Sequence, residues 1–289
     1  MKPPPLEYHD PRSVDEALAL LAEHGDESKV LAGGQSLVPL LNFRLARPER
    51  LIDINPIGEL GYIRRRDGVL RIGTMARQVA LEQSGVVAAN WPLLTEAMTF
   101  VAHPQIRNRG TVGGSVAHAD PAAELPVAFL ALDATFHVRS ARGARSVPAS
   151  EFFLTHLTTA LEPDELLAEI EVRPLPPRTG HAFTEFARRH GDFGLGGAAV
   201  LVTLDDDDAC ASASIVLLAA DAVPLRAGDA ERALVGRRID AAAAADAARA
   251  AVQDVSPTGD IHGSSEYRRD LIEALVRRAV LTAGERADG

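Results

Sequence analysis

The chain has 289 residues, 46% of them hydrophobic and 24% charged, which is typical of a globular protein with room for two domains. Its formal net charge of −10 argues against nucleic acid as a partner, because displacing the counterions of a phosphate backbone needs a basic face. The single cysteine, Cys210, excludes both an intrachain disulfide and an iron–sulfur cluster held by the usual four thiolates. No stretch is apolar enough for a signal peptide or a membrane span, so we expect a cytoplasmic protein.

The first sixty residues are predicted to alternate between strands and helices. Ser13 and Glu16 have the spacing of a capping box, which starts a helix that should end at Gly25 in the C′ position. We expect strands at 29–31 and 50–54, with a helix over 37–45 between them. This order favours an α/β layer with short connections.

The rest of the chain has mixed character. The middle third is predicted to hold strands at 69–73, 135–140 and 167–172, helices at 77–83 and 92–101, and a Gly-rich segment over 110–121. Prolines make residues 173–177 the best linker, since they cannot extend a helix or a central strand. Beyond it we expect a small sheet with helices on one face, from strands at 198–204 and 213–219 and helices at 240–252 and 267–282. The four aspartates at 205–208 are interpreted as a solvated hairpin tip, because adjacent carboxylates repel each other.

Two glycine pairs carry most of the chemical information. In Ala32-Gly33-Gly34-Gln35-Ser36, two glycines between a strand and a helix permit positive φ and let backbone amides converge near the helix N-terminus. The turn therefore predicts an anion cradle, although a tight turn without a ligand has the same residues. It is neither a Walker A loop nor a G-x-G-x-x-G Rossmann turn. A second turn, Gly110-Thr111-Val112-Gly113-Gly114-Ser115, adds two hydroxyls, and a diphosphate held between both turns would explain the pair.

Several nearby side chains keep two interpretations. Asp120 could accept from ribose hydroxyls or could cap the next helix ahead of Pro121. His103 and His118 could be acid–base groups or structural hydrogen-bonding residues. Arg107 and Arg109 could reach a phosphate or pair with carboxylates, and Cys210 is expected to be a small buried hydrophobe.

Three stretches occur in the order seen in one family: LAGGQSLVPLLNFRLARPERLIDIN, HPQIRNRGTVGGSVAHADPAAELP and RRHGDFGLGGAAV. With the C-terminal GSSEYRRDLIEALVRRAV, they resemble the FAD-binding medium subunit of aerobic carbon monoxide dehydrogenase and its relatives among the xanthine dehydrogenase-type molybdenum hydroxylases. The resemblance covers essentially the whole chain. It implies an α+β fold with a PCMH-type FAD-binding domain at 1–175, in subdomains of about 1–57 and 58–175. A small carbon monoxide dehydrogenase flavoprotein-like C-terminal domain of antiparallel sheet and helices is expected at 178–289.

The resemblance also implies the cofactor contacts. The two loops would hold the FAD pyrophosphate, Glu124 stands where relatives place an acidic residue near the adenosine end, and Asp192-Phe193 matches a pair near the isoalloxazine ring. The full expected set is Leu31, Ala32, Gly33, Gly34, Gln35, Ser36, Leu37, Val101, Thr111, Gly113, Gly114, Ser115, Glu124, Leu167, Asp192 and Phe193. Some relatives have a lysine in the strand before the Asp-Phe pair where this sequence has Glu185, so no lysine contact to the flavin is expected.

As a member of such an enzyme, the chain would be an oxidoreductase subunit with non-covalent FAD and no catalytic side chain or metal site of its own. The resemblance implies a large partner subunit with the molybdenum cofactor and a small one with [2Fe-2S] clusters, assembled as a dimer of heterotrimers. Electrons would reach FAD from the clusters and leave to NAD, a quinone or another acceptor. Two alternatives remain: a stand-alone flavin oxidoreductase, which the absence of a histidine between Leu31 and Asp53 limits to non-covalent FAD, and a nucleotide-binding scaffold.

Overall fold

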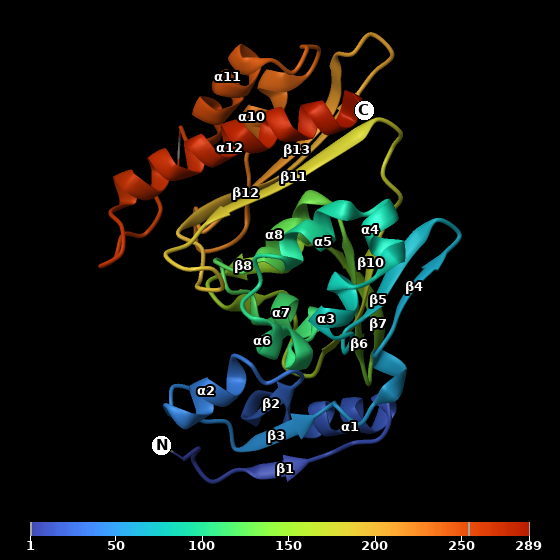
Figure 1. Ribbon diagram of the computed structural model, residues 1–289. Helices are drawn as coiled ribbons and strands as arrows, with labels where there is room; N and C mark the ends of the chain where they lie inside the picture. Colours follow the sequence, from blue (N-terminus) through green and yellow to red (C-terminus); the bar gives the residue numbers. More distant parts are fainter. Residues whose placement is uncertain (1, 254, 289) are drawn as a thin grey trace.

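The computed structural model describes residues 2–253 and 255–288. Three main β-sheets follow one another along the chain and along the long axis of the molecule, with the N-terminal part at one end and the C-terminal part at the other (Figure 1). The α+β fold class expected from the sequence is confirmed, with a two-part N-terminal region followed by an antiparallel C-terminal sheet and its helices.

The N-terminal sheet is parallel, with strand order β1-β3-β2, as the alternation of strands and helices predicts. Its elements are β1 (Glu7–His9), α1 (Val14–His24), the 3₁₀ turn η1 (Gly25–Glu27), β2 (Ser28–Leu31), α2 (Leu37–Asn42) and β3 (Arg50–Asp53). The α1 cap differs from a full capping box, because the Ser13 Oγ accepts from Glu16 N but the Glu16 carboxylate accepts from Arg12 N. Gly25 is right-handed rather than a left-handed C′ residue. A glycine is needed there because a Cβ would lie 2.6 Å from the Pro163 carbonyl oxygen.

The middle sheet is antiparallel, with strand order β4-β5-β10-β6-β7. One face carries apolar side chains such as Ile72 and Phe136, which pack against a layer of short helices around the fully buried Trp91. The 3₁₀ turn η2 (Gly58–Leu60) precedes its strands, which are β4 (Ile63–Arg66), β5 (Val69–Gly73), β6 (Thr135–Ser140), β7 (Gly143–Pro148) and β10 (Leu166–Val172). A separate two-stranded sheet is formed by β8 (Phe153–Thr155) and β9 (Thr158–Thr159). The helices are α3 (Gln78–Glu82), α4 (Gly85–Asn90), α5 (Pro92–Met98), α6 (Pro104–Arg109), α7 (Val112–His118), α8 (Glu124–Ala131) and α9 (Ala149–Phe152).

The C-terminal sheet is buried on both faces. Ala198 and Val200 of one strand belong to the core under the C-terminal helices, whereas Ala199 and Leu201 of the same strand join the core of the middle part. The sequence predicted helices on one face of this sheet. The structure has the C-terminal helices on one face and α5 and α8 of the middle part on the other. The elements, with strand order β11-β12-β13-β14, are β11 (Thr179–Phe186), β12 (Gly196–Leu204), β13 (Cys210–Leu218), β14 (Leu225–Arg226), α10 (Gly228–Leu234), α11 (Ala241–Ala251) and α12 (Ser265–Asp288).

Several sequence expectations need correction. The Gly-rich segment at 110–121 is largely helix α7, and α4 and α6 were not expected. The helix predicted over 37–45 stops at Asn42, because Arg44 adopts a left-handed φ of 59°. The helix predicted over 92–101 stops at Met98 and is followed by Ala102 with a φ of 40°. Among the helices of the described residues, none is long and apolar enough to cross a membrane.

Candidate cofactor site

The loop between β2 and α2 has the properties of an anion cradle. Gly34 adopts a φ of 72°, which only glycine takes readily. Within residues 2–253 and 255–288, the five consecutive backbone amides from Gly33 to Leu37 have no hydrogen-bond acceptor. Ser36 precedes α2 without using its side chain as a cap, so its hydroxyl is also free. A run of free amides at the start of a helix favours a bound phosphate.

At the second glycine pair, most backbone amides are already hydrogen-bonded, in contrast to those of the first loop. Thr111 is the N-cap of α7, and its Oγ1 accepts from Gly114 N at 3.1 Å. The amides of Val112 and Gly113 donate to the carbonyls of Ala76 and Thr74, so this helix start has few free donors. Gly113 has no positive φ, and its role is close packing, because a Cβ would lie 1.8 Å from Thr74 Oγ1. What this segment offers a ligand is therefore the hydroxyl of Ser115 and a smooth backbone surface.

The two glycine motifs touch each other. A Cβ on Gly33 would lie 2.6 Å from the carbonyl oxygen of Arg109 and 2.8 Å from Gly110 Cα. On the other side, a Cβ on Gly114 would lie 3.4 Å from the Ala32 Cβ. The structure thus brings together residues 32–36 and 109–115, which the sequence separates by more than seventy positions.

Two residues that were not expected in the site join these motifs. Asn55, which follows β3, donates from its side-chain amide to the carbonyl of Ala32 at 2.7 Å. Arg77 donates to Asn55 Oδ1 at 2.8 Å and also to the carbonyl of Arg109. The position of Asn55 could have been inferred, because the carboxyl ends of neighbouring parallel strands meet at one edge of a sheet. Arg77 directly precedes α3 and forms a β-bridge with Thr111, and the helix predicted over 77–83 gave no signal for either contact.

The hairpin between β11 and β12 carries the predicted Asp192-Phe193 pair. Gly191, at a φ of 88°, lies against the His103 ring and the Ala102 carbonyl, where a Cβ would come within 2.3 Å of the ring. The hairpin therefore rests on the segment that contains Val101. Phe193 itself is 68% exposed, so its ring is available to a planar partner. Asp192 pairs with Arg188 at 3.4 Å within the same hairpin.

The structure gives different roles to Arg107 and Arg109, which the sequence left with two interpretations. Arg107 is buried and structural, because it forms a two-point ion pair with Glu82 and donates to the carbonyl of Val101 at 2.7 Å. It fixes the segment on which the hairpin rests. Arg109 is exposed beside the first loop. Burial, and then the charge of Arg109, lower the pKa of Arg77.

Two acidic residues lie together near the hairpin. Glu124 is the first residue of α8 and is 8% exposed, and burial raises its pKa to about 7. Glu185 belongs to β11, and burial together with the charge of Glu124 raises its pKa to about 9. The Glu185 Oε1 abuts Gly194, next to Phe193. The position of Glu124 relative to the bound cofactor stays a prediction.

The remaining expected residues are placed as follows. Leu31 and Leu37 are partly buried at the two ends of the first loop, and Leu167 of β10 is buried, with 2% of its surface exposed. The Asp120 carboxylate accepts from Ala122 N in a turn before α8, so it does not cap the helix itself. Burial lowers the pKa of His118, which favours the neutral ring. Cys210 is buried and burial raises its pKa to about 11, as expected for a structural thiol.

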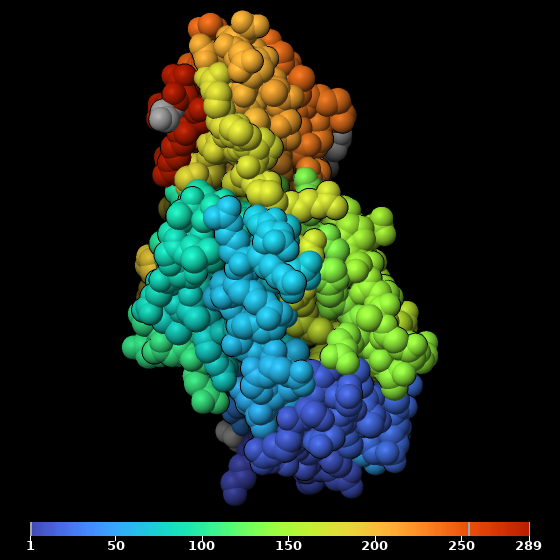
Figure 2. All heavy atoms as spheres, turned by 90° about the vertical axis from the view of Figure 1, so that its right-hand side faces the viewer, coloured from blue at the N-terminus to red at the C-terminus, as the bar shows by residue number. Residues whose placement is uncertain are grey.

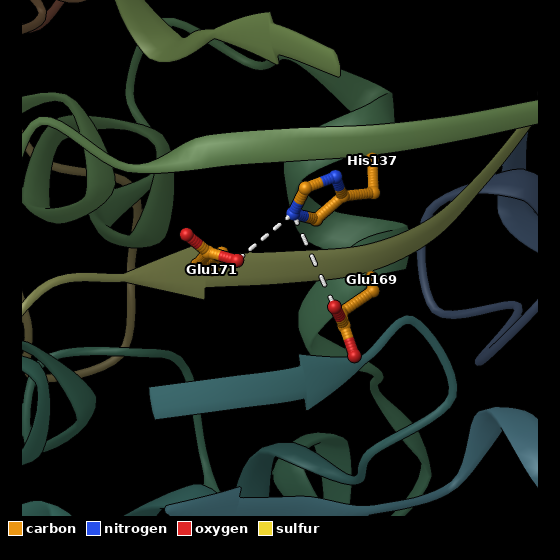
Figure 3. A group of neighbouring side chains, drawn as sticks. All are labelled: His137, Glu169 and Glu171. Atoms are coloured by element: carbon orange, nitrogen blue, oxygen red, sulfur yellow. Dashed lines mark hydrogen bonds and ion pairs between the residues drawn. The ribbon is translucent and has the colours of Figure 1, made fainter. Parts of the chain in front are cut away.

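The opposite face of the middle sheet carries a separate polar group. His137 Nε2 lies 3.2 Å from Glu171 Oε2 and 4.0 Å from Glu169 Oε1, in a spacing that a metal ion could bridge (Figure 3). The group lines a surface hollow with Tyr62 and Arg64, visible between the cyan and green segments in Figure 2.

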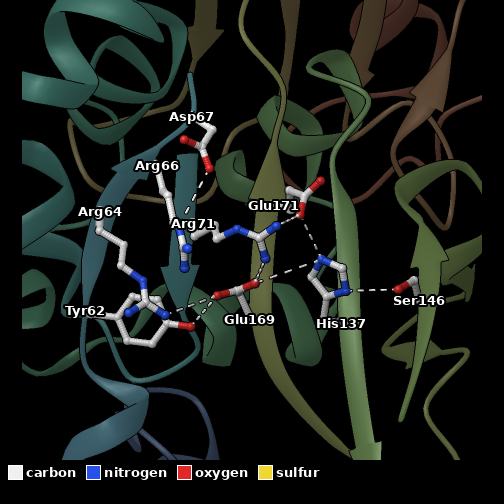
Figure 4. A network of polar contacts seen from close by, with 9 residues as sticks. All are labelled: Tyr62, Arg64, Arg66, Asp67, Arg71, His137, Ser146, Glu169 and Glu171. Atoms are coloured by element: carbon white, nitrogen blue, oxygen red, sulfur yellow. Dashed lines mark hydrogen bonds and ion pairs between the residues drawn. The ribbon is translucent and has the colours of Figure 1, made fainter. Parts of the chain in front are cut away.

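Arg71 already satisfies this group without a metal. Its guanidinium donates to Glu169 Oε1 at 2.5 Å and to Glu171 Oε2 at 2.6 Å, which are the oxygens that face the histidine (Figure 4). Tyr62 donates to Glu169 as well, and burial and this carboxylate raise its pKa to about 12. Arg64 lies 3.8 Å from Glu169 Oε2, so two guanidinium groups balance the two carboxylates, and we interpret the group as a network that stabilises the sheet face.

Comparison with known proteins connects this geometry to a family. Residues 4–176 match the FAD binding domain in molybdopterin dehydrogenase, and residues 181–283 match the CO dehydrogenase flavoprotein C-terminal domain. The chain is 47% identical over 287 residues to the 6-hydroxypseudooxynicotine dehydrogenase complex subunit alpha of Paenarthrobacter nicotinovorans, which covers 99% of this chain and 97% of that one.

Solved structures agree over the whole fold. A chain of the carbon monoxide dehydrogenase from Hydrogenophaga pseudoflava, in a form that lacks the Mo-pyranopterin moiety, superimposes with a TM-score of 0.96 at 40% identity over 99% of both chains. A chain of quinoline 2-oxidoreductase from Pseudomonas putida 86 gives 0.94 at 39% identity, again over 99% of both. The resemblance seen in the sequence is confirmed: the chain belongs to the family of FAD-binding medium subunits of molybdenum hydroxylases.

Proposed function

We propose that this chain holds FAD non-covalently between its two glycine motifs and relays electrons within a molybdenum-dependent dehydrogenase complex. The observation that carries the proposal is the run of free amides from Gly33 to Leu37, pressed against the start of α7. Such a run suits the pyrophosphate of a dinucleotide, which brings two negative charges and several acceptor oxygens. FAD, when bound, supplies the ability to take up and release electrons one or two at a time.

Each part of the site has a proposed role. The amides of the first loop, with the hydroxyls of Ser36 and Ser115, would bind the pyrophosphate, while Leu31, Leu37, Val101 and Leu167 would give apolar contacts. The exposed ring of Phe193 would stack against the isoalloxazine, held in place by the hairpin that rests on Val101 to His103. We also propose that the domains divide at the Pro-rich connection, into 1–175 and 178–289.

The proposed partners follow from the family. We propose a large subunit with the molybdenum cofactor and a small subunit with [2Fe-2S] clusters, assembled as a dimer of heterotrimers. In this scheme electrons reach this chain from the clusters and leave to NAD, a quinone or another acceptor. The cytoplasmic location expected from the sequence stays a prediction, which fractionation of cells that express the complex would test.

A purification experiment tests the central proposal. The chain, produced alone and with its genomic neighbours, should be yellow and should release about one FAD per chain when denatured with acid. Iron and molybdenum should copurify only when the partner subunits are present. A colourless protein that does not take up added FAD would contradict the proposal, and flavin that stays attached after denaturation would contradict its non-covalent form. Substrate turnover by the isolated chain would instead favour a stand-alone flavin oxidoreductase.

A further inference from the structure

The carboxyl group of Glu185 is buried without a partner. Its Oε2 is inaccessible to solvent and makes no hydrogen bond within residues 2–253 and 255–288, while its Oε1 abuts Gly194. Leaving a buried acid without a hydrogen-bond partner destabilises the protein, because the group loses its contacts with water and gains none in return. Such a group is expected where a ligand completes the hydrogen bonding.

A second acid lies beside it from another part of the chain. Glu185 is on β11 of the C-terminal sheet and Glu124 begins α8 of the middle part, which packs on that sheet, and the charge of Glu124 acts on Glu185 across this junction. The surroundings contain no counter-charge for the pair among the groups that act on it. Asp120, in the turn before α8, adds further negative charge. Burial lowers the pKa of the nearby His118, so its ring favours the neutral form. Arg188 on the hairpin already pairs with Asp192.

Two carboxyls in such surroundings hold at least one proton between them. Burial and mutual repulsion both disfavour a second negative charge, as in other buried acid pairs. The pair can then donate a hydrogen bond as well as accept one. A flavin ring edge has carbonyl oxygens and ring nitrogens that need such a donor.

We propose that Glu185 and Glu124 form one acid pair that hydrogen-bonds the isoalloxazine ring of bound FAD and makes the reduction potential of the flavin depend on the protonation of the pair. The inference rests on the proposed function and adds a regulation to it. The position of Glu185 supports a contact with the isoalloxazine ring. Its Oε1 abuts Gly194, which directly follows the exposed Phe193 in the chain. Loss of the shared proton places negative charge beside the ring and disfavours added electrons, so the potential falls as the pair ionises.

The test uses the full chain loaded with FAD and measures the reduction potential of the flavin across pH 6 to 10. In the wild type, the potential should fall more steeply between about pH 7 and about pH 9, where the two carboxyls titrate. In Glu185→Gln the steeper fall near pH 9 should disappear, whereas the one near pH 7 should remain, because burial raises the pKa of Glu124 independently of Glu185. The exposed Glu151→Gln is the matched control and should follow the wild type.

Affinity gives a second readout. Glu185→Gln keeps a hydrogen-bond donor and should hold FAD within about threefold of the wild type, whereas Glu185→Ala should weaken binding about tenfold, the size of one lost hydrogen bond. Superimposable potential–pH curves for wild type and Glu185→Gln, with equal FAD affinity in all variants, would overturn the acid pair while leaving the glycine clamp intact. A wild-type chain that binds no FAD would overturn the proposed function itself.

Discussion

Replacing Gly33 with alanine tests the contact between the two glycine motifs. The φ of Gly33 lies outside the left-handed region, so alanine is conformationally acceptable and the effect is steric. The new methyl group would lie 2.6 Å from the Arg109 carbonyl oxygen, 2.8 Å from Gly110 Cα and 3.0 Å from Thr111 N. All three atoms belong to the backbone, so no flexible side chain can move away.

The displacement can be worked out from these distances. A relaxed carbon–oxygen contact is about 3.4 Å, so the loops must separate by roughly 0.8 Å. A pyrophosphate hydrogen bond of about 2.9 Å to one loop would then lengthen to about 3.7 Å, which is no longer a hydrogen bond. Overpacking of this kind typically costs about 1–3 kcal/mol, which corresponds to roughly fivefold to 150-fold in FAD affinity.

The assay is titration of FAD into the apoprotein by isothermal calorimetry, with thermal unfolding measured on the same samples. Gly85→Ala is the matched control, because no atom lies within 4 Å of the added Cβ and the residue begins helix α4, where alanine is favourable. Gly33→Ala with FAD affinity within about threefold of the wild type would refute the two-loop clamp. Gly33→Val should abolish FAD retention for the same reason.

Three further predictions concern stability and the flavin environment. Gly113→Ala places a Cβ 1.8 Å from Thr74 Oγ1, and differential scanning fluorimetry should show a melting temperature several degrees lower, while an unchanged one would contradict the packing. Phe193→Ala should leave the melting temperature of the apoprotein unchanged, because the ring is 68% exposed, but should shift the flavin absorption spectrum or potential. Because Glu124 and Glu185 have folded pKa values raised to about 7 and about 9 from the ordinary 4.5, the folded state holds protons that the unfolded state releases. The free energy of unfolding should therefore fall as pH rises from about 4.5 to about 9, and urea titrations should show that Glu185→Gln flattens this fall.

Strands, helices and turns were predicted accurately where the hydrophobic periodicity agrees with the capping and turn residues at the ends of the element. The strand predicted at 135–140 matches β6, and Asp240 caps α11 close to the predicted start. The aspartate run at 205–208 joins β12 and β13, with Asp205 accepting from Asp207 N and Ala209 N in the turn. In each case the signal is local, so the chain around it decides the structure.

The prediction was wrong where tertiary packing overrides local preference. Two glycines should disfavour a helix at 112–118, yet Gly113 is required there because Thr74 leaves no room for a Cβ. Thr111 was an available N-cap signal that the glycines obscured. The pairing of Glu124 with Glu185 could not be predicted, since it depends on how the C-terminal sheet rests on α8.

The site is assembled from three sheets, and this division has a mechanical consequence. The first loop belongs to the N-terminal sheet, the α7 motif to the middle part, and the Phe193 hairpin to the C-terminal sheet (Figure 1). Asn55 and Arg77 join the first two, and Gly191 against His103 joins the last two. A ligand that contacts the first loop, the α7 motif and the Phe193 hairpin binds only when these parts are packed together. Its binding should therefore stabilise the contacts between the three parts by mass action. FAD binding should therefore protect the amides around Asn55 and His103 from hydrogen exchange as well as those of the loop it contacts.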